Sequence, residues 1–400
     1  MKILIVSQYF YPEDFKVNDI AFDFVKRGHE VTVFTAKPNY PQGNFYKGYS
    51  FFGKSFEIIN GVKVIRIPIF PRLNGSGKFL ILNYVSFIFF AFIYKYRVKE
   101  NFDIVFSHLP SPLIAALPAI WLKKKCNAKL YLWVLDLWPE SVQANSKIKD
   151  GFLMKELNNL IKYIYNKSDV IFISSKFFRN SILDKGIDQN KTIKYFPNWA
   201  EDIFINNETD VANTPNLPNG FNIMFAGNIG DSQDFESVLE AAKLTIHENI
   251  NWILVGDGRR VSWIKSEIGK HKITNVHLLG RYPINTMPAF FKKADAMLVS
   301  LKDSPTFSLT VPAKVQAYMA SSKIILGMFN GEGQQIINQS GCGYAVNAGD
   351  FIELVKAVKK IKASANAEKI VMQQKSKDYY LNNFSKNELF NQLEKEFLNQ

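Results

Sequence analysis

Short runs of apolar residues recur along the chain, and the segments between them carry apolar residues at helical spacing. Runs that are apolar throughout and separated by helix-length segments are typical of a parallel sheet whose two faces are both covered by helices. The first helix is expected over Asn18–Arg27, before Gly28. The strands predicted for the first half of the chain are Ile3–Ser7, Glu30–Thr35, Val62–Ile69, Ile104–Ser107, Leu130–Leu135, Val170–Ser174 and Thr192–Tyr195.

The alternation breaks between residues 198 and 221 and then starts again. Residues 206–220 are rich in Asn, Thr and Pro and have no apolar period, which indicates a linker. The strands predicted after it are Phe221–Ala226, Trp252–Val255, Val276–Leu279, Ala296–Ser300, Lys323–Leu326 and Gly343–Val346. The pattern therefore predicts an α/β protein with two doubly wound, Rossmann-like domains, residues 1–200 and residues 201–385.

The last segment, residues 386–400, is predicted to be a helix. Its apolar residues lie at roughly helical spacing, at Leu389, Phe390, Leu393, Phe397 and Leu398. We expect this helix to dock back on the first domain.

Composition narrows the class of protein. The 400 residues suit two domains, and the two cysteines exclude a disulfide framework and a four-thiolate zinc site, which fits a reducing cytosol. Residues 1–200 hold 28 Lys or Arg against 15 Asp or Glu, so the whole net charge of +13 lies in that half. We expect the first domain to face an anionic surface or polymer, and the alternative is a Lys-rich solvated face.

One uncharged stretch, Phe79–Tyr94, contains 16 residues, five of them Phe. A helix of that length measures about 24 Å, short of the roughly 30 Å hydrocarbon core of a bilayer. Cations flank it on both sides, which is typical of a helix that lies in the membrane interface, whereas the alternative is a buried helix packed on the sheet. The residues expected at the membrane are Phe79, Phe87, Phe89, Phe90, Lys95 and Arg97. The apolar start of the chain is too short for a signal peptide and is predicted to be a buried strand.

Two glycine-rich turns in the second half are candidates for binding a phosphorylated ligand. Gly227–Gly230 and Gly256–Gly258 each follow a predicted strand and precede a helix, where glycine lets backbone N–H groups approach an anion. Lys314 stands next to a Pro-bounded turn and adds a cation, unless it is an ordinary surface lysine. The sequence lacks a P-loop, a Gly-x-Gly-x-x-Gly after the first strand and a Gly-x-Ser-x-Gly elbow, which argues against ATPases, dinucleotide dehydrogenases and serine hydrolases.

Three polar residues at predicted strand ends in the first half are candidates for catalysis. Asp136 follows a buried strand, and a carboxylate there is costly unless it is paired or used, although it could also cap a helix. Glu140 lies in the turn beyond, where it could simply favour a helix N-terminus. His108 follows another strand and has a pKa range suited to proton transfer.

Taken together, the chain resembles glycosyltransferase family 4, the retaining GT-B transferases of bacterial polysaccharide assembly. The motifs that carry the resemblance are Lys2-Ile3-Leu4-Ile5-Val6 with Tyr11-Pro12, Arg27-Gly28-His29-Glu30-Val31, Asp136-Leu137-Trp138-Pro139-Glu140-Ser141, Ala226-Gly227-Asn228-Ile229-Gly230, Val255-Gly256-Asp257-Gly258, Leu279-Gly280-Arg281, Pro312-Ala313-Lys314 and Gly331-Glu332-Gly333. The stretch around Trp138 is similar to the subgroup that makes O-antigen, capsule and colanic-acid repeats, which includes transferases assigned to L-fucosamine.

The resemblance implies a GT-B fold, in which two Rossmann-like domains face a central cleft. It implies a hexosyltransferase-class enzyme (EC 2.4) that moves a sugar from a nucleotide diphosphate, UDP by expectation, to a polyprenyl-diphosphate-linked saccharide, without a metal or other cofactor. The expected sugar is an N-acetylated amino or deoxyamino sugar, and the expected place is the cytoplasmic face of the bacterial membrane, with no nucleic-acid partner. The expected donor residues are Gly227, Asn228, Ile229, Gly230, Gly256, Asp257, Gly258, Arg281, Lys314 and Glu332, and the expected acceptor loop carries Tyr11, Glu13 and Lys16.

The chain departs from the family pattern at several positions. The two acids of a Glu-x7-Glu signature are replaced by Leu309 and Ala317, and Asn228 and Asp234 stand where many members have cations. We expect Lys314 to take over the diphosphate, and Glu332 to replace the missing ribose ligand. A UDP-sugar 2-epimerase of the same fold and a catalytically silent, membrane-bound scaffold are the alternative functions.

Overall fold

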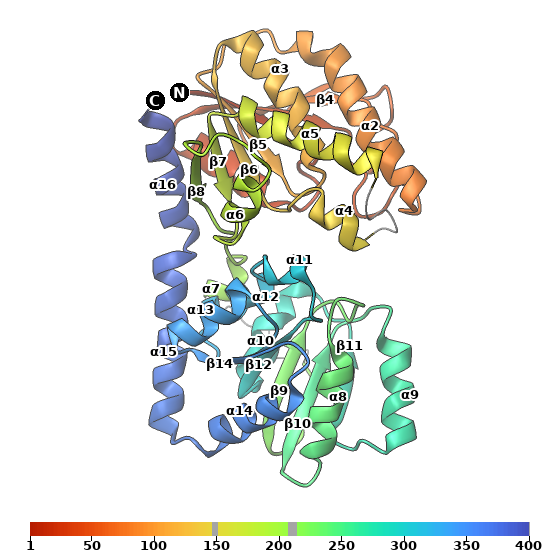
Figure 1. The fold of residues 1–400 in the computed structure, drawn as a ribbon, viewed down its shortest axis with the longest axis vertical. Helices are drawn as coiled ribbons and strands as arrows, with labels where there is room; N and C mark the ends of the chain where they lie inside the picture. The colour runs from red at the N-terminus through yellow and green to blue at the C-terminus, as the bar shows by residue number, and fades with distance from the viewer. Residues whose placement is uncertain (146–150, 207–213, 400) are drawn as a thin grey trace. The chain divides into compact units, whose positions relative to one another are not determined.

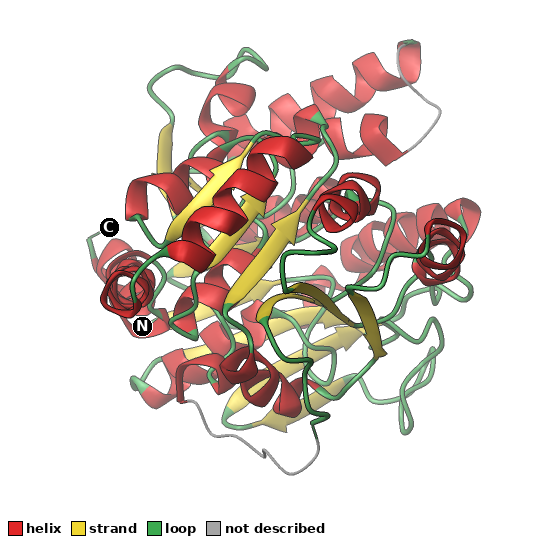
Figure 2. Ribbon diagram, turned by 90° about the horizontal axis from the view of Figure 1, so that it is seen from below, coloured by secondary structure: helices red, strands yellow, loops and turns green. Residues whose placement is uncertain are grey.

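The computed structural model describes residues 1–145, 151–206 and 214–399, which form two compact units (Figure 1). The first unit comprises Met1–Phe196 and Gln392–Gln400, and the second comprises Pro197–Asn391. Each unit is built on its own sheet, with helices packed against the strands (Figure 2). This confirms the predicted α/β class with two parallel-sheet domains.

The first sheet has eight strands in the order β3-β4-β2-β1-β5-β6-β7-β8. Neighbours pair in parallel, except that β3 runs antiparallel to β4 at the edge. Because the chain leaves β1 toward β2 on one side and resumes with β5 on the other, the topological switch point lies between β1 and β5, the usual place for ligands. The strands are β1 (Lys2–Val6), β2 (Glu30–Ala36), β3 (Phe56–Ile59), β4 (Val62–Ile67), β5 (Ile104–Leu109), β6 (Lys129–Val134), β7 (Val170–Ile173) and β8 (Thr192–Tyr195).

The helices of the first unit connect these strands. In α1, Val17, Ile20, Ala21 and Phe24 lie at helical spacing and are buried, which explains why this segment folds as a helix against the sheet. The helical segments are α1 (Lys16–Lys26), α2 (Gly77–Tyr94), η1 (Lys95–Arg97), η2 (Leu113–Ala116), α3 (Leu117–Cys126), α4 (Glu140–Asn145), α5 (Phe152–Lys167) and α6 (Phe178–Leu183).

The second sheet has six strands, all parallel, in the order β11-β10-β9-β12-β13-β14. Its switch point lies between β9 and β12. The strands are β9 (Phe221–Ala226), β10 (Ile250–Val255), β11 (Val276–Gly280), β12 (Ala296–Ser300), β13 (Ile325–Met328) and β14 (Gly343–Val346). The helices of this unit are α7 (Ile203–Asn206), α8 (Phe235–Leu244), α9 (Val261–His271), η4 (Ile284–Thr286), α10 (Met287–Lys293), α11 (Pro305–Ser308), α12 (Ala313–Ala320), α13 (Glu332–Ser340), α14 (Phe351–Ala363) and α15 (Asn366–Asn383).

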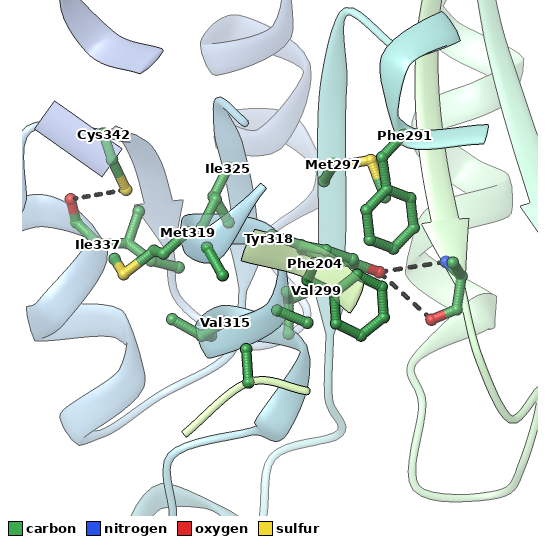
Figure 3. Close-up of a cluster of buried hydrophobic side chains, with 14 of the residues drawn as sticks. Phe204, Phe291, Met297, Val299, Val315, Tyr318, Met319, Ile325, Ile337 and Cys342 are labelled. Atoms are coloured by element: carbon green, nitrogen blue, oxygen red, sulfur yellow. Dashed lines mark hydrogen bonds between the residues drawn. The ribbon is translucent and has the colours of Figure 1, made fainter. Parts of the chain in front are cut away.

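A buried hydrophobic cluster joins the helices of the second unit to its sheet (Figure 3). The ring of Phe204, from α7, stacks on Phe291 at 5.4 Å between centroids, and Tyr318 meets Phe291 edge-on at 5.2 Å. The short helix α7, which directly precedes the predicted linker of residues 206–220, is therefore anchored in this core. Residues 207–213 of that linker lie outside the described residues.

Helix α16 (Lys386–Leu398) lies across the boundary of the two units, because its residues from Gln392 onward belong to the first. Phe397 is buried and lies with its ring centroid 5.6 Å from Phe24, 5.9 Å from Phe106 and 5.0 Å from Tyr131. Glu394 accepts a hydrogen bond of 2.8 Å from Arg27. The end of the chain thus fills part of the core of the first unit.

The edge strand β3 was not predicted. Its residues alternate between exposed and half-buried, and Phe56 and Ile58 point to the exposed side with 58% and 67% of their surfaces accessible. The prediction rested on strands that are apolar throughout, a pattern that central strands show and this edge hairpin does not.

Candidate active site

Two glycine turns meet at the carboxyl ends of β9 and β10. The Gly227 N–H donates to the Val255 carbonyl at 2.9 Å, and the Ile229 N–H donates to the Asp257 carbonyl at 2.9 Å. A Cβ on Gly256, whose φ is +143°, would overlap the Gly227 carbonyl oxygen, so this close approach requires glycine. The structure therefore brings together the two turns predicted to bind phosphate.

A tyrosine fixes the end of β9 directly before the first turn. The Tyr318 hydroxyl, on α12, accepts from the Ala226 N–H at 3.1 Å and donates to the Ala226 carbonyl at 3.3 Å (Figure 3). The side chain of Tyr318 is fully buried, so these bonds hold helix and strand end in one arrangement. This role of Tyr318 was not predicted from the sequence.

Lys314, in the first turn of α12, lies against the first glycine turn. Its Cε stands 2.9 Å from the position that a Cβ on Gly227 would occupy, and its Nζ lies 4.8 Å from the centre of the Phe225 ring. Burial lowers the pKa of Lys314 to about 8, and no carboxylate among the described residues pairs with it. A partly buried cation without a counter-ion, beside a glycine turn, is an arrangement that a phosphate can complete.

The other predicted donor residues occupy the same carboxyl edge of the second sheet. The Gly256 N–H donates to the Gly280 carbonyl at 2.8 Å, which brings the exposed Arg281 next to the second turn. Asp257 uses its carboxylate to accept from the Gly258 N–H at 2.8 Å. The side-chain nitrogen of Asn228 lies 2.6 Å from the place of a Cβ on Gly230, so Asn228 folds over its own turn.

Glu332 lies farther along this edge, at the start of α13. Its side chain is buried, at 4% exposure. The glycines on either side pack closely on the segment before α12: a Cβ on Gly331 would overlap the Ser308 carbonyl, and one on Gly333 would lie 3.0 Å from Pro312. The carboxylate stands at a helix N-terminus, which stabilises its negative charge.

In the first unit, Asp136 follows β6 and is held by neighbouring side chains. The Ser141 hydroxyl donates to its carboxylate, and the Trp138 indole N–H donates to the neighbouring Ser111 hydroxyl at 3.2 Å. Burial raises the pKa of Asp136, and the hydrogen bond from Ser141 opposes the rise. Asp136 is thus a half-buried, oriented carboxylate.

The other two catalytic candidates are less available than the sequence indicated. Glu140 forms an ion pair with Lys185 at 2.6 Å and accepts from Ser181 at 2.9 Å, so it fixes α4 to α6. His108 is 1% exposed, and burial lowers its pKa to about 3, which leaves a neutral and weakly basic ring at pH 7. Its Nδ1 lies 3.1 Å from the Ser7 hydroxyl across the switch point.

The predicted acceptor loop is built on a buried acid. Tyr11 is 45% exposed and Lys16 is half-buried, but Glu13 is fully buried. The Glu13 carboxylate accepts from the N–H groups of Asn39 at 2.8 Å and Tyr40 at 2.7 Å, and burial raises its pKa to about 7. The expectation that Glu13 faces a ligand is therefore wrong: it ties two loops together.

Helix α2 has its polar side inward. Asn83 accepts from Gln8 at 2.7 Å and donates to the Phe70 carbonyl at 2.6 Å, and both Asn83 and Ser86 are buried. The opposite side exposes Ile81, Leu82, Val85, Phe89, Phe92, Ile93 and Tyr96. We call these seven residues the outer face of α2.

The six residues predicted at the membrane divide between the two sides of this helix. Phe89 is 58% exposed, whereas Phe79 and Phe90 are half-buried. Phe87 is fully buried, so its assignment to the membrane is wrong. The cations remain at the end of the helix, where Lys95 lies 3.8 Å from the Phe92 ring centre and Arg97 lies 4.2 Å from that of Tyr94.

Among the described residues, one helical stretch, Gly77–Arg97, is long and apolar enough to cross a membrane, and only 22% of its most apolar window is buried. Length and composition alone are weak evidence for a membrane span, because core helices of soluble proteins pass the same test. Over the same described part of the chain, no group of three His, Cys, Asp or Glu side chains is placed to hold a metal ion.

Comparison with known proteins agrees with this architecture. The family model "Glycosyltransferase Family 4" matches residues 17–200, and "Glycosyl transferases group 1" matches residues 220–363. The chain is 26% identical to a protein of Pseudomonas aeruginosa named as a glycosyltransferase, WbjE, over 73% of this chain and 74% of that one. It is 24% identical to an Escherichia coli K12 protein named as a colanic acid biosynthesis glycosyl transferase, WcaI, over 80% and 81% of the two chains.

A solved structure shows the same fold. HepE of Anabaena, in complex with UDP, aligns with a TM-score of 0.68 and 11% identity, over 100% of both chains. The two sheets, the glycine turns at the carboxyl edge of the second sheet and these sequence relatives lead to one conclusion. The chain is a GT-B glycosyltransferase whose first half matches glycosyltransferase family 4 and which is related to a protein named for colanic acid biosynthesis.

Proposed function

We propose that the protein is a retaining transferase that takes an N-acetylated amino or deoxyamino sugar from a UDP-linked donor. The acceptor is a polyprenyl-diphosphate-linked saccharide of a surface polysaccharide. The observation that carries the donor assignment is Lys314, a partly buried cation next to Gly227 that has no paired carboxylate in the described part of the chain. The same fold in a UDP complex of HepE supports UDP as the nucleotide.

In this proposal, the donor diphosphate lies at the carboxyl edge of the second sheet. Backbone N–H groups of the two glycine turns, Lys314 and Arg281 neutralise its charge, so that no metal ion is needed. Glu332 takes the ribose hydroxyls in place of the acids that are absent at Leu309 and Ala317. Lys314 also stabilises the departing diphosphate, because the negative charge on the diphosphate grows in this step.

The reaction replaces one bond of the anomeric carbon by another on the same face of the sugar. The bond from this carbon to the diphosphate oxygen breaks, the acceptor oxygen forms the new bond, and the acceptor proton passes to the departing diphosphate oxygen. Asp136 is proposed to orient the acceptor hydroxyl and to stabilise the positive charge that develops on the sugar ring. Its bond with Ser141 and its half-burial give it a fixed direction.

We also propose that the protein is cytoplasmic and sits on the inner face of the bacterial membrane through the outer face of α2. The exposed apolar side chains lie along a helix that has Lys78 in its first turn and is followed by Lys95, Arg97 and Lys99. This arrangement fits the boundary of an anionic lipid layer. The buried Asn83 and Ser86 keep the helix attached to its own domain.

The decisive experiment combines the purified full chain with a panel of UDP-sugars and a prenyl-diphosphate-linked saccharide. We expect one UDP-sugar to raise the melting temperature and to give a product that keeps the anomeric configuration of the donor. Inversion of that configuration would refute the retaining mechanism. A panel in which no nucleotide sugar stabilises the protein would refute the donor site, and donor binding without transfer would favour the silent scaffold.

A further inference from the structure

One arginine, Arg72, lies where α2 meets the carboxyl edge of the first sheet. Arg72 is half-buried, and its guanidinium carbon lies 4.9 Å from the centre of the Tyr40 ring. Its backbone N–H donates to the Asn39 side chain at 3.1 Å, which fixes the chain at this point. Among the described residues, no carboxylate forms an ion pair with Arg72.

The aromatic residues around Arg72 hold it in one place. Tyr40 lies with its ring centroid 5.8 Å from Tyr9 and 5.3 Å from Phe15, and Tyr9 stacks on Phe15 at 4.5 Å. Tyr9 is 3% exposed and anchors the cluster in the core, whereas Tyr40, on which Arg72 stacks, is 37% exposed and can be reached from solvent. A guanidinium stacked on such a cluster is preorganised to use its planar face for stacking and its N–H groups for an anion.

Tyr84 of α2 connects this arginine with the proposed acceptor carboxylate. It is half-buried and lies close enough to Tyr9, Arg72 and Asp136 to interact with each of them electrostatically. Burial raises the pKa of Tyr9 and of Tyr84, so both hydroxyls keep their hydrogens near neutral pH. The Tyr84 hydroxyl can therefore donate a hydrogen bond to an anionic oxygen.

We infer that Arg72 and Tyr84 bind the diphosphate of the lipid-linked acceptor. This inference rests on the proposed function, and it adds a site for the charged part of that substrate. Guanidinium groups bind phosphate oxygens in pairs, and a diphosphate offers more such oxygens than a single phosphate ester.

The order of groups along the protein matches the order of groups in the substrate. Ile81, Leu82 and Val85, which surround Tyr84 in α2, are 64%, 43% and 53% exposed and would contact the prenyl chain. Arg72 and Tyr84 come next, for the diphosphate. Asp136, with which Tyr84 interacts, would face the sugar that follows the diphosphate.

A phospholipid headgroup is a second source of phosphate at a membrane surface, and the experiment has to separate the two. We would titrate the full chain with geranyl diphosphate, with geranyl monophosphate and with vesicles of phosphatidylglycerol. The wild type is expected to prefer the diphosphate. The Arg72→Ala variant should lose this affinity about tenfold or more, because a charge-assisted pair is removed.

Two further variants separate binding from folding. Tyr84→Phe keeps the ring and removes only the hydroxyl, so it should weaken diphosphate binding about threefold to tenfold at an unchanged melting temperature. Arg179→Ala is the control, because Arg179 is an exposed arginine of the first unit, on α6, and is not among the residues proposed for the membrane or the donor. It should leave diphosphate binding unchanged.

Equal affinity of the wild type and Arg72→Ala for geranyl diphosphate would overturn the inference. The inference would also be overturned if the wild type did not prefer geranyl diphosphate to geranyl monophosphate and if Arg72→Ala lost vesicle binding as much as diphosphate binding. That result would assign Arg72 to phospholipid headgroups. These titrations need no transfer reaction and no UDP-sugar. If Arg72-dependent binding occurs while no UDP-sugar stabilises the protein, then the donor site is wrong and the acceptor subsite stands. If a UDP-sugar stabilises the protein while diphosphate binding does not depend on Arg72, then the donor site stands and the acceptor subsite is wrong.

Discussion

Lys314 allows a prediction in which stability and binding change in opposite directions. An ordinary lysine has a pKa near 10.4, whereas burial lowers that of Lys314 to about 8. This difference corresponds to at most about 3 kcal/mol of destabilisation, and solvent screening of the partly buried group reduces it to about 1 kcal/mol. Lys314→Met keeps much of the side-chain volume and removes the charge.

We therefore expect Lys314→Met to raise the melting temperature of the ligand-free protein by about 2–4 °C, the shift that about 1 kcal/mol gives in a domain of this size. The same variant should bind UDP about tenfold to a hundredfold more weakly, because a charge-assisted contact of about 1.5–3 kcal/mol is lost. Thermal unfolding and calorimetric titration with UDP measure the two effects. Lys270→Met, an exposed lysine near the end of α9, is the matched control and should change neither.

The pH dependence gives an independent check of the same residue. The unprotonated lysine dominates in the free protein above pH 8, while a bound diphosphate favours the protonated form. The affinity for a UDP-sugar should thus be constant below pH 8 and fall up to tenfold per pH unit above it, and Lys314→Met should abolish this slope. Unchanged UDP binding in Lys314→Met, or a loss of both stability and binding, would refute the donor assignment.

Three further predictions concern other parts of the molecule. Asp136→Asn keeps the shape and removes the charge, so turnover should fall about 10²-fold while the UDP-induced rise in melting temperature stays the same; near-normal turnover would place the acceptor hydroxyl elsewhere. Phe89→Gln should reduce flotation with phosphatidylglycerol vesicles about tenfold, whereas Ile370→Gln, 63% exposed on α15, should not, and equal flotation of both would contradict the role of α2. Gly256→Ala should destabilise the protein by more than about 1 kcal/mol and abolish UDP binding, whereas Gly269→Ala, at a position open to solvent in α9, should stabilise it by about 0.5–1 kcal/mol. Urea unfolding measures both changes, and an unchanged stability of Gly256→Ala would contradict the close approach of the two turns.

The sequence predicted the strands correctly where both faces of a strand are buried. Central strands such as β1 and β9 are covered on both faces and therefore appear as continuous apolar runs, and the glycines that their connections require were visible as turns. The family motifs located the carboxyl edges of both sheets. These features depend on local sequence alone, which is why they could be predicted.

The direction of a side chain could not be predicted in the same way. The segment that forms α2 is apolar nearly all round, so its pattern did not reveal that Asn83 and Ser86 face inward and that Phe87 is buried while Phe89 is exposed. In the sequence, Glu13 has the pattern of an exposed acid in a loop. In the structure it is buried, because its carboxylate accepts hydrogen bonds from the backbone N–H groups of Asn39 and Tyr40, 26 and 27 residues away. Such outcomes depend on partners that are distant in the chain.

Helix α16 sets a limit on how this chain can exchange parts with a relative. Because residues from Gln392 onward belong to the first unit, the polypeptide passes between its two units twice rather than once. A fragment that stops at Phe196 would leave Phe24, Phe106 and Tyr131 without Phe397, their partner from the far end of the gene. A recombination that swaps the N-terminal half alone would therefore pair each core with a foreign last helix, and productive chimaeras require two crossovers, with the C-terminal helix inherited from the same parent as the first strand.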